Sequence, residues 1–138
     1  MIIVGAKGFA KEVLEVLHQL NQLDHLVFYD DVNEDAPAFL YEKFPILRTK
    51  EAAAYYFKTV DNRFTIGIGN PALRKKLALE FEAMGGVFTS TISPLAQIGH
   101  YGNSIGEGSN IMANVLISND VQIGNGCIIY FKSIITHD

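Results

Sequence analysis

Isoleucine recurs at every sixth position in the second half of this chain, and this spacing restricts the folds that the chain can adopt. The series consists of Ile105, Ile111, Ile117, Ile123, Ile129 and Ile135, preceded by Ile92 and Ile98 at the same step with one residue inserted. A small or β-branched residue stands four positions after most of these isoleucines, and glycine often follows directly. A period of six fits neither an amphipathic helix, which repeats every ~3.6 residues, nor a single strand, which alternates.

A chain that bends after each short strand explains this period, because the isoleucine then always points into the interior of a triangular prism. Each repeat is too short to bury its apolar side alone, so repeats must stack on their neighbours. The pattern therefore predicts a left-handed parallel β-helix of hexapeptide repeats, with three hexads in each coil. Ile117 and Ile135 should then lie on the same face, one coil apart. A β-sandwich with coincidental spacing is the alternative, and the single register of the isoleucines argues against it.

Short apolar strands alternate with helical patterns in the first half of the chain. Strands are expected at residues 1–4, 25–29 and 63–68, helices at 9–20, 51–57 and 71–84, and irregular structure at 32–49. Alternation of this kind indicates a parallel sheet with right-handed crossovers. We therefore predict an α/β plus β chain, with a small Rossmann-like parallel-sheet domain at residues 1–87 and an incomplete hexapeptide-repeat β-helix at residues 88–138.

Three loops should meet at the carboxyl edge of this sheet, where doubly wound folds bind nucleotides. The residues concerned are Gly5, Lys7 and Gly8 after the first strand, Asp30 and Asp31 after the second, and Gly69 and Asn70 after the third. Glycines before a helix can hold a phosphate on backbone N–H groups, and an acidic residue after the next strand can bind a ribose hydroxyl. Each loop alone is equally explained as a turn, and the G-x-x-G spacing is only a weak indication of a nicotinamide cofactor. Together the loops favour a nucleotide or nucleotide-sugar site.

Charge and cysteine content argue against several classes of partner. The net charge is −4 and no long block of lysine or arginine occurs, so neither nucleic acid nor an anionic membrane surface is an expected partner. The single cysteine, Cys127, cannot form an internal disulfide, which favours a reducing compartment. We recognise no signal peptide in the sequence. No apolar stretch approaches the length of ~20 residues that a membrane-spanning helix needs. We expect a cytoplasmic protein.

Two histidines, His100 and His137, each follow a repeat isoleucine by two residues. They should lie two coils apart on one edge, roughly 10 Å from each other at the usual strand spacing. That separation is too large for one metal within a chain, so no metal is expected, and a zinc site shared between subunits is not indicated. His137 is followed by Asp138, and a histidine with an acidic neighbour can act as a general base. A lone surface histidine is the ordinary alternative.

Four segments in order carry a resemblance over the whole chain, namely GAKGFAKEV, FYDD, IGIGNPALRKKL and the hexads that end in SIITHD. This order resembles bacterial sugar acetyltransferases of the sialic-acid O-acetyltransferase type, and especially the UDP-4-amino-sugar N-acetyltransferases. The resemblance implies that residues 5–8 hold the pyrophosphate of a UDP-sugar and that Asp30 and Asp31 face the uracil and ribose. It also implies that Gly69 and Asn70 line the pocket.

The resemblance further implies acetyl-CoA as co-substrate, His137 as the catalytic base and Asp138 as its acidic partner. It implies a homotrimer with the active site between adjacent β-helices. Three departures stand out. Phe9 occupies a position where the family usually has histidine, and Tyr130 and Phe131 replace a common Asn-Thr pair. The chain also ends where the family continues into the coils that bind acetyl-CoA, so we expect a fragment of a longer protein.

The leading hypothesis is an acetyl-CoA-dependent acetyltransferase that acts on a UDP-linked amino sugar. A sugar O-acetyltransferase is a second hypothesis, because an amine and a hydroxyl acceptor both need only a base. A third is a UDP-sugar-binding module, or an inactive truncated transferase without the acetyl-CoA coils. A β-helix that only scaffolds a trimer is the fourth.

Overall fold

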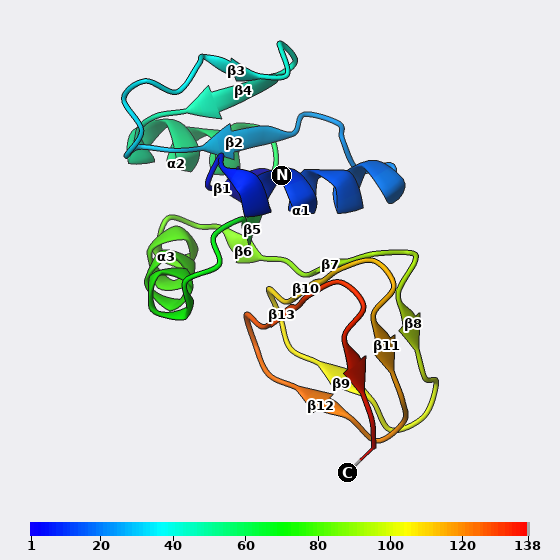
Figure 1. Cartoon of the computed structure of the whole chain (residues 1–138). Helices are drawn as coiled ribbons and strands as arrows, with labels where there is room; N and C mark the ends of the chain where they lie inside the picture. Colours follow the sequence, from blue (N-terminus) through cyan, green and yellow to red (C-terminus); the bar gives the residue numbers. More distant parts are fainter. Residues whose placement is uncertain (138) are drawn as a thin grey trace.

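A computed structural model describes residues 1–137, in which a six-stranded sheet with helices on both faces adjoins a prism of short strands (Figure 1). The helices are α1 (Gly8–Gln19), α2 (Lys50–Thr59) and α3 (Pro71–Ala83). The strands of the sheet, in spatial order, are β3 (Phe39–Leu40), β4 (Phe44–Leu47), β2 (Val27–Tyr29), β1 (Ile2–Val4), β5 (Arg63–Ile66) and β6 (Val87–Phe88). Apart from β3, neighbouring strands in this sheet are parallel.

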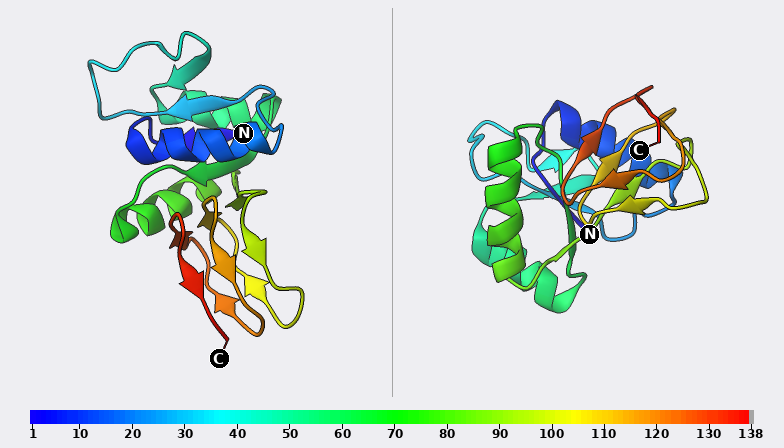
Figure 2. Two further views of the ribbon diagram at one scale, coloured as in Figure 1. Left: turned by 45° about the vertical axis from the view of Figure 1, so that its right-hand side comes forward. Right: turned by 90° about the horizontal axis from the view of Figure 1, so that it is seen from below.

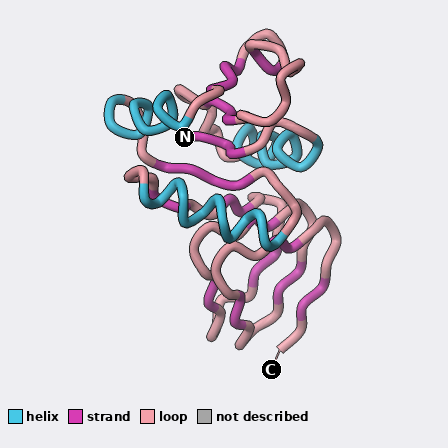
Figure 3. The backbone as a smooth tube through the Cα atoms, turned by 90° about the vertical axis from the view of Figure 1, so that its left-hand side faces the viewer, coloured by secondary structure: helices cyan, strands magenta, loops and turns pink. Residues whose placement is uncertain are grey.

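Both faces of the sheet are buried, which explains why its central strands are continuously apolar. Ile3 and Phe28 pack with α1 in one core cluster, while Ile2 and Phe64 pack with α2 and α3 in another. Successive residues of a strand point to opposite faces, so each strand feeds both clusters. The predicted small Rossmann-like sheet is confirmed, and Figure 3 shows α3 crossing between the sheet and the prism.

Residues 32–49, expected to be irregular, contain the strands β3 and β4. Strand β4 extends the parallel sheet by pairing with β2, and β3 pairs antiparallel with β4. Pro45 and the turn residues argued against strands here, but Phe44 and Ile46 alternate with less buried neighbours and pack into the core under α1. Burial against a neighbouring helix therefore overrides the local turn signals.

The prism is the predicted β-helix. Its first face holds β7 (Thr91–Ile92), β10 (Asn110–Ile111) and β13 (Ile128–Ile129), its second β8 (Gln97–Ile98), β11 (Leu116–Ile117) and β14 (Ile134–Ile135), and its third β9 (Ser104–Ile105) and β12 (Gln122–Ile123). The repeat isoleucines pair in register, with Ile117 opposite both Ile98 and Ile135. The hexad prediction is thus confirmed, and the residue inserted in the first coil is taken up at a corner where Gly102 has a φ of +69°.

Two corners of the prism contact the α/β part through hydrogen bonds. Tyr130, after β13, bonds to Glu12 of α1, and Gly108, before β10, accepts a hydrogen bond from Arg74 of α3. The remaining corner, called here the far corner, consists of residues 99–103, 118–121 and 136–137. Figures 1 and 2 show the red C-terminal end of the ribbon, after β14, on the side of the prism away from the helices.

Arg74 joins the two parts of the chain through a buried network, with only 4% of its surface exposed. Its guanidinium donates to the carbonyl oxygens of Ile66, Ile68, Gly108 and Gly126 and to the side-chain oxygen of Asn110. Burial lowers the pKa of Arg74 to about 10, so the side chain stays charged at neutral pH. Asn110 in turn donates to the hydroxyls of Thr65 and Thr91. The network spans the sheet, α3 and two coils of the β-helix.

Within residues 1–137, no helix combines the length and the apolar character that crossing a membrane requires.

Candidate functional site

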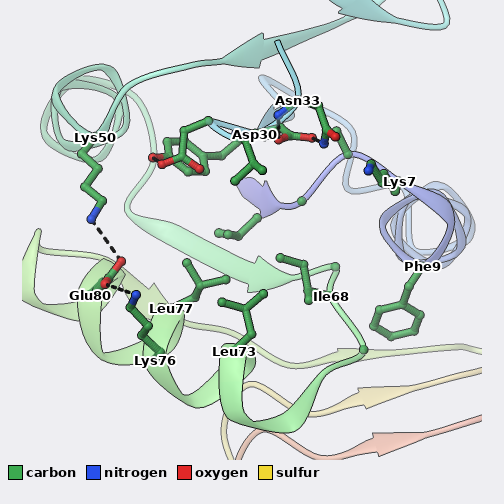
Figure 4. Close-up of a pocket in the computed structure, with 18 residues that line it drawn as sticks. Lys7, Phe9, Asp30, Asn33, Lys50, Ile68, Leu73, Lys76, Leu77 and Glu80 are labelled. Atoms are coloured by element: carbon green, nitrogen blue, oxygen red, sulfur yellow. Dashed lines mark hydrogen bonds and ion pairs between the residues drawn. The ribbon is translucent and has the colours of Figure 1, made fainter. Parts of the chain in front are cut away.

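A cleft of about 550 Å³ opens at the carboxyl edge of the sheet, where β1, β2 and β5 end (Figure 4). Of the residues singled out in the sequence, those that line it are Gly5, Lys7, Asp30, Asp31 and Gly69. Gly8 and Asn70 flank it, since Gly8 begins α1 and the Asn70 side chain accepts a hydrogen bond from Leu73 N at 3.0 Å as the cap of α3. The crossover topology thus brings the three loops to one site, as the parallel order predicts.

The glycines around the cleft differ in what the fold requires of them. Gly5 has a φ of +105°, and a Cβ atom there would lie 2.9 Å from Ile68 Cγ1, so the turn itself demands glycine. A Cβ atom at Gly8 or at Gly69 would meet nothing within 4 Å. The folded chain does not need glycine at these two positions, and the space that they leave is open to the atoms of a ligand.

The N-terminus of α1 is suited to binding an anion. In the part of the chain that is described, Thr49 caps α2 and Asn70 caps α3, whereas no side chain caps α1 at Lys7. The first N–H groups of a helix lack partners within it, and the helix dipole favours negative charge there. Together with the Lys7 ammonium, this end of the cleft suits a phosphate or diphosphate.

The two aspartates after β2 have different environments. Asp30 is buried, and its carboxylate accepts hydrogen bonds from the backbone N–H groups of Val32 and Asn33 and from the Asn33 amide. Burial alone would raise the pKa of Asp30, but these hydrogen bonds and the charge of Arg48 hold it below the usual value. Asp31 is exposed and accepts a hydrogen bond from the Tyr29 hydroxyl at 2.9 Å. Asp30 therefore orders the loop, while Asp31 faces solvent at the cleft.

Replacing Asp30 by asparagine should lower the free energy of unfolding by about 1–2 kcal/mol at pH 7, because an amide NH₂ would then face the Asn33 donor. A folded-state pKa below the unfolded value stabilises the protein above the unfolded pKa of ~3.9, and this contribution disappears as the pH falls further. The difference between native protein and variant should therefore shrink below about pH 4. Urea denaturation at pH 7 and pH 3 measures it, and a difference that is the same at both pH values would contradict this role.

The far wall of the cleft is apolar and ends in an ion-pair cluster. Ile68, Leu73 and Leu77 form the wall, and beyond them Glu80 lies 3.2 Å from the Lys50 ammonium and 3.9 Å from that of Lys76 (Figure 4). Figure 4 shows this cluster and Phe9 at opposite ends of the cleft. An anion-binding end followed by an apolar slot with polar groups at its rim matches a phosphorylated ligand with a flat ring.

Sequence reasoning missed the residues that α2 and α3 contribute. Leu73, on α3, is 39% exposed and lines the cleft. Lys50 and Glu80 carried no signal, because single charges on helices usually belong to solvated faces.

His137 is exposed and lies on the far corner of the prism, two residues after β14. The pairing of β14, β11 and β8 places His100 and His137 two coils apart on this corner. Asp138, the predicted partner of His137, lies outside the described residues. Among residues 1–137, no three His, Cys, Asp or Glu side chains gather as a metal-binding group. Within the described residues, the cleft lies in the α/β part, whereas His137 lies on the far corner of the β-helix.

Comparison with protein families gives two matches. The PglD N-terminal domain family matches residues 1–81, and the bacterial transferase hexapeptide family, described as six repeats, matches residues 104–137. No curated protein matches the chain. The two matches fall on the α/β part with its cleft and on the β-helix, respectively.

Solved structures share the whole architecture. The chain is similar to PerB from Caulobacter crescentus in complex with CoA and GDP-perosamine, at 28% identity and a TM-score of 0.86, over 99% of this chain and 62% of PerB. It is similar to WeeI from Acinetobacter baumannii at 27% identity and a TM-score of 0.80, over 100% of this chain and 65% of WeeI. The acetyltransferase domain of PglB from Neisseria gonorrhoeae, at 24% identity, a TM-score of 0.83 and coverage of 99% and 64%, shows the same fold. The chain thus spans less than two thirds of the length of these proteins. Their similarity to it confirms the predicted fold.

Proposed function

Because the chain belongs to the PglD N-terminal domain family and continues into hexapeptide repeats, we propose that it is part of a sugar acetyltransferase. The proposed reaction transfers an acetyl group from acetyl-CoA to the amino group of a nucleotide-linked sugar. The observation that carries the proposal is the cleft, with an uncapped helix N-terminus at one end and an apolar wall at the other. A nucleoside diphosphate sugar supplies phosphates for the first and a flat base for the second. The complex of PerB with CoA and GDP-perosamine supports this choice.

UDP is the nucleotide that we propose, on the basis of the resemblance to the UDP-4-amino-sugar enzymes. GDP is the alternative, since PerB is seen with GDP-perosamine. The diphosphate binds at residues 5–8 and the base lies along Leu73 and Leu77. Asp31 accepts a hydrogen bond from the ribose, while Asp30 and Asn70 hold the surrounding loop and helix in place.

The proposed chemistry needs one base. The amine nitrogen of the sugar attacks the acetyl carbonyl, the new C–N bond forms, and the C–S bond to CoA breaks. The His137 imidazole takes the proton that the nitrogen loses and returns one to the sulfur, so CoA leaves as the thiol. Since the far corner lies across the β-helix from the cleft, His137 meets the sugar held by another copy of the chain. This separation favours an active site shared between copies, and the resemblance to the trimeric family is the reason for proposing a homotrimer.

Calorimetric titration with UDP and with GDP tests the nucleotide site. The native chain should bind one of them, and Gly8→Ala and Gly69→Ala should each weaken binding about tenfold, because the added methyl group occupies space meant for the ligand. Both variants should unfold at the native temperature, since a Cβ atom meets nothing there.

Gly124→Ala is the matched control, because a Cβ atom there only touches Cys127 Sγ at 3.9 Å, in the β-helix. It should bind like the native chain. A folded native chain that binds neither nucleotide would refute the proposed function. Equal binding by all variants would move the site away from the cleft.

A further inference from the structure

Three aromatic side chains that are distant in sequence meet at the β-helix end of the cleft. Phe9, in the first turn of α1, lines the cleft, and Tyr130 and Phe131 occupy the corner between β13 and β14. The rings of Phe9 and Tyr130 are 6.3 Å apart between centroids, and those of Tyr130 and Phe131 are 4.9 Å apart, nearly edge to face. We call Phe9, Tyr130 and Phe131 the aromatic platform.

A hydrogen bond fixes the middle ring of the platform. The Tyr130 hydroxyl lies 2.6 Å from both carboxylate oxygens of Glu12. Phe9 and Glu12 are three residues apart on α1, so they share one helix face, and Tyr130 contacts both. The hydrogen bond to Glu12 raises the pKa of Tyr130, which keeps the phenol protonated as the donor. Tyr130 therefore supports the Phe9 ring from the β-helix side.

The position of Phe9 relative to the phosphate end indicates what it contacts. Phe9 directly follows the loop of residues 5–8, where the diphosphate is proposed to bind. On one side of this loop, the cleft runs along Leu73 and Leu77 to the Lys50–Glu80 ion pair. Phe9 lies at the opposite end of the cleft (Figure 4). If the base takes the apolar wall, the group on the other side of the diphosphate meets Phe9. In a nucleotide sugar that group is the pyranose ring.

We propose that Phe9 is a specificity-determining residue that packs against the C–H face of the sugar ring, and that Tyr130 and Glu12 position it. This inference rests on the proposed function and adds the contact that recognises the sugar. A pyranose presents C–H groups on its ring face, and these pack well on an aromatic ring. The Tyr130 hydroxyl is already bonded to Glu12, so the platform recognises ring shape and apolar surface rather than sugar hydroxyls.

The test compares UDP with UDP-N-acetylglucosamine by calorimetry, on the native chain and on Phe9→Ala, Phe9→Tyr and Tyr130→Phe. If GDP is the nucleotide that binds, GDP and GDP-mannose replace this pair. Phe9→Ala should weaken binding of the nucleotide sugar about five- to tenfold and leave the affinity for the diphosphate unchanged, as the loss of one aromatic contact predicts. Phe9→Tyr should bind the nucleotide sugar with native affinity, because an aromatic ring remains at this position. Tyr130→Phe should weaken binding of the nucleotide sugar about twofold, because the ring remains but the hydrogen bond to Glu12 is lost.

Phe39→Ala is the matched control, since Phe39 is a half-exposed phenylalanine on β3. It should change neither affinity. Equal weakening of diphosphate and nucleotide sugar by Phe9→Ala would make Phe9 a structural wall and overturn the inference. Unchanged affinity for both would also overturn it, because the sugar would then lie elsewhere. If the folded native chain binds neither UDP nor GDP, the result refutes the proposed function itself, before the role of Phe9 is tested.

Discussion

Replacement of Arg74 by methionine is expected to lower the free energy of unfolding by about 3–5 kcal/mol. Methionine fills much of the same volume, so the main loss is hydrogen bonding rather than packing. The carbonyl oxygens of Ile66 and Gly108, and the Asn110 side-chain oxygen, would lose their buried donor. A buried acceptor without a partner costs about 1–3 kcal/mol, and several are affected at once. Urea denaturation followed by circular dichroism measures the change.

Two further variants separate this explanation from others. Arg74→Lys keeps the charge, but one ammonium cannot reach acceptors that lie on several segments, so we expect it to recover less than half of the loss. Lys75→Met, at the exposed neighbouring position on α3, should change the free energy of unfolding by less than about 0.5 kcal/mol. If Arg74→Met matches that control, apolar packing alone holds the two parts together.

The Arg74 network also connects stability with the cleft. The carbonyl of Ile68, which accepts from Arg74 at 3.0 Å, directly precedes Gly69 in the cleft wall. The same guanidinium holds Gly108 and Gly126 at the prism corner beside α3. One side chain therefore fixes the cleft wall relative to the β-helix, and the orientation of the proposed sugar site toward the prism depends on Arg74.

The hexads were predictable because their signal is repeated. Each isoleucine confirms the six-residue register of the others. With three hexads in each coil, this register predicts the observed pairing of Ile98, Ile117 and Ile135. Arg74 lacked any such signal. It stands in a run of basic residues on a helix, where solvated side chains are the rule, and only the contact with the β-helix buries it.

The part of the candidate site that was predictable is the part whose position follows from the strand topology alone. Parallel strands end at one edge, so the loops at Gly5, Asp30 and Gly69 had to meet. The aromatic platform shows the limit of this reasoning. Phe9 and Tyr130 stood out separately as departures from a family pattern, but a contact between side chains so distant in sequence has no local signature. Only the folded chain shows that the two departures form one feature.

Replacement of His137 by alanine in the full-length protein is expected to reduce acetyl transfer about 10²–10⁴-fold, the usual contribution of a general base. The affinity for the nucleotide sugar should change little, because the proposed contacts to the diphosphate and the base come from the cleft, which His137 does not line. Release of CoA thiol with a UDP-4-amino sugar measures the rate. His100→Ala, two coils earlier on the same corner, is the matched control and should keep native activity.

A complementation experiment tests whether the base comes from another copy of the chain. Gly69→Val should weaken substrate binding and His137→Ala should remove the base, so each protein alone should be nearly inactive. When the two are co-expressed, mixed oligomers contain some sites with an intact cleft from one copy and an intact His137 from another. Recovery of activity on mixing is therefore expected, and it requires a shared site, because no single chain in the mixture holds both functional parts. Mixtures that stay as inactive as the separate variants would place the cleft and the base of one active site in one chain.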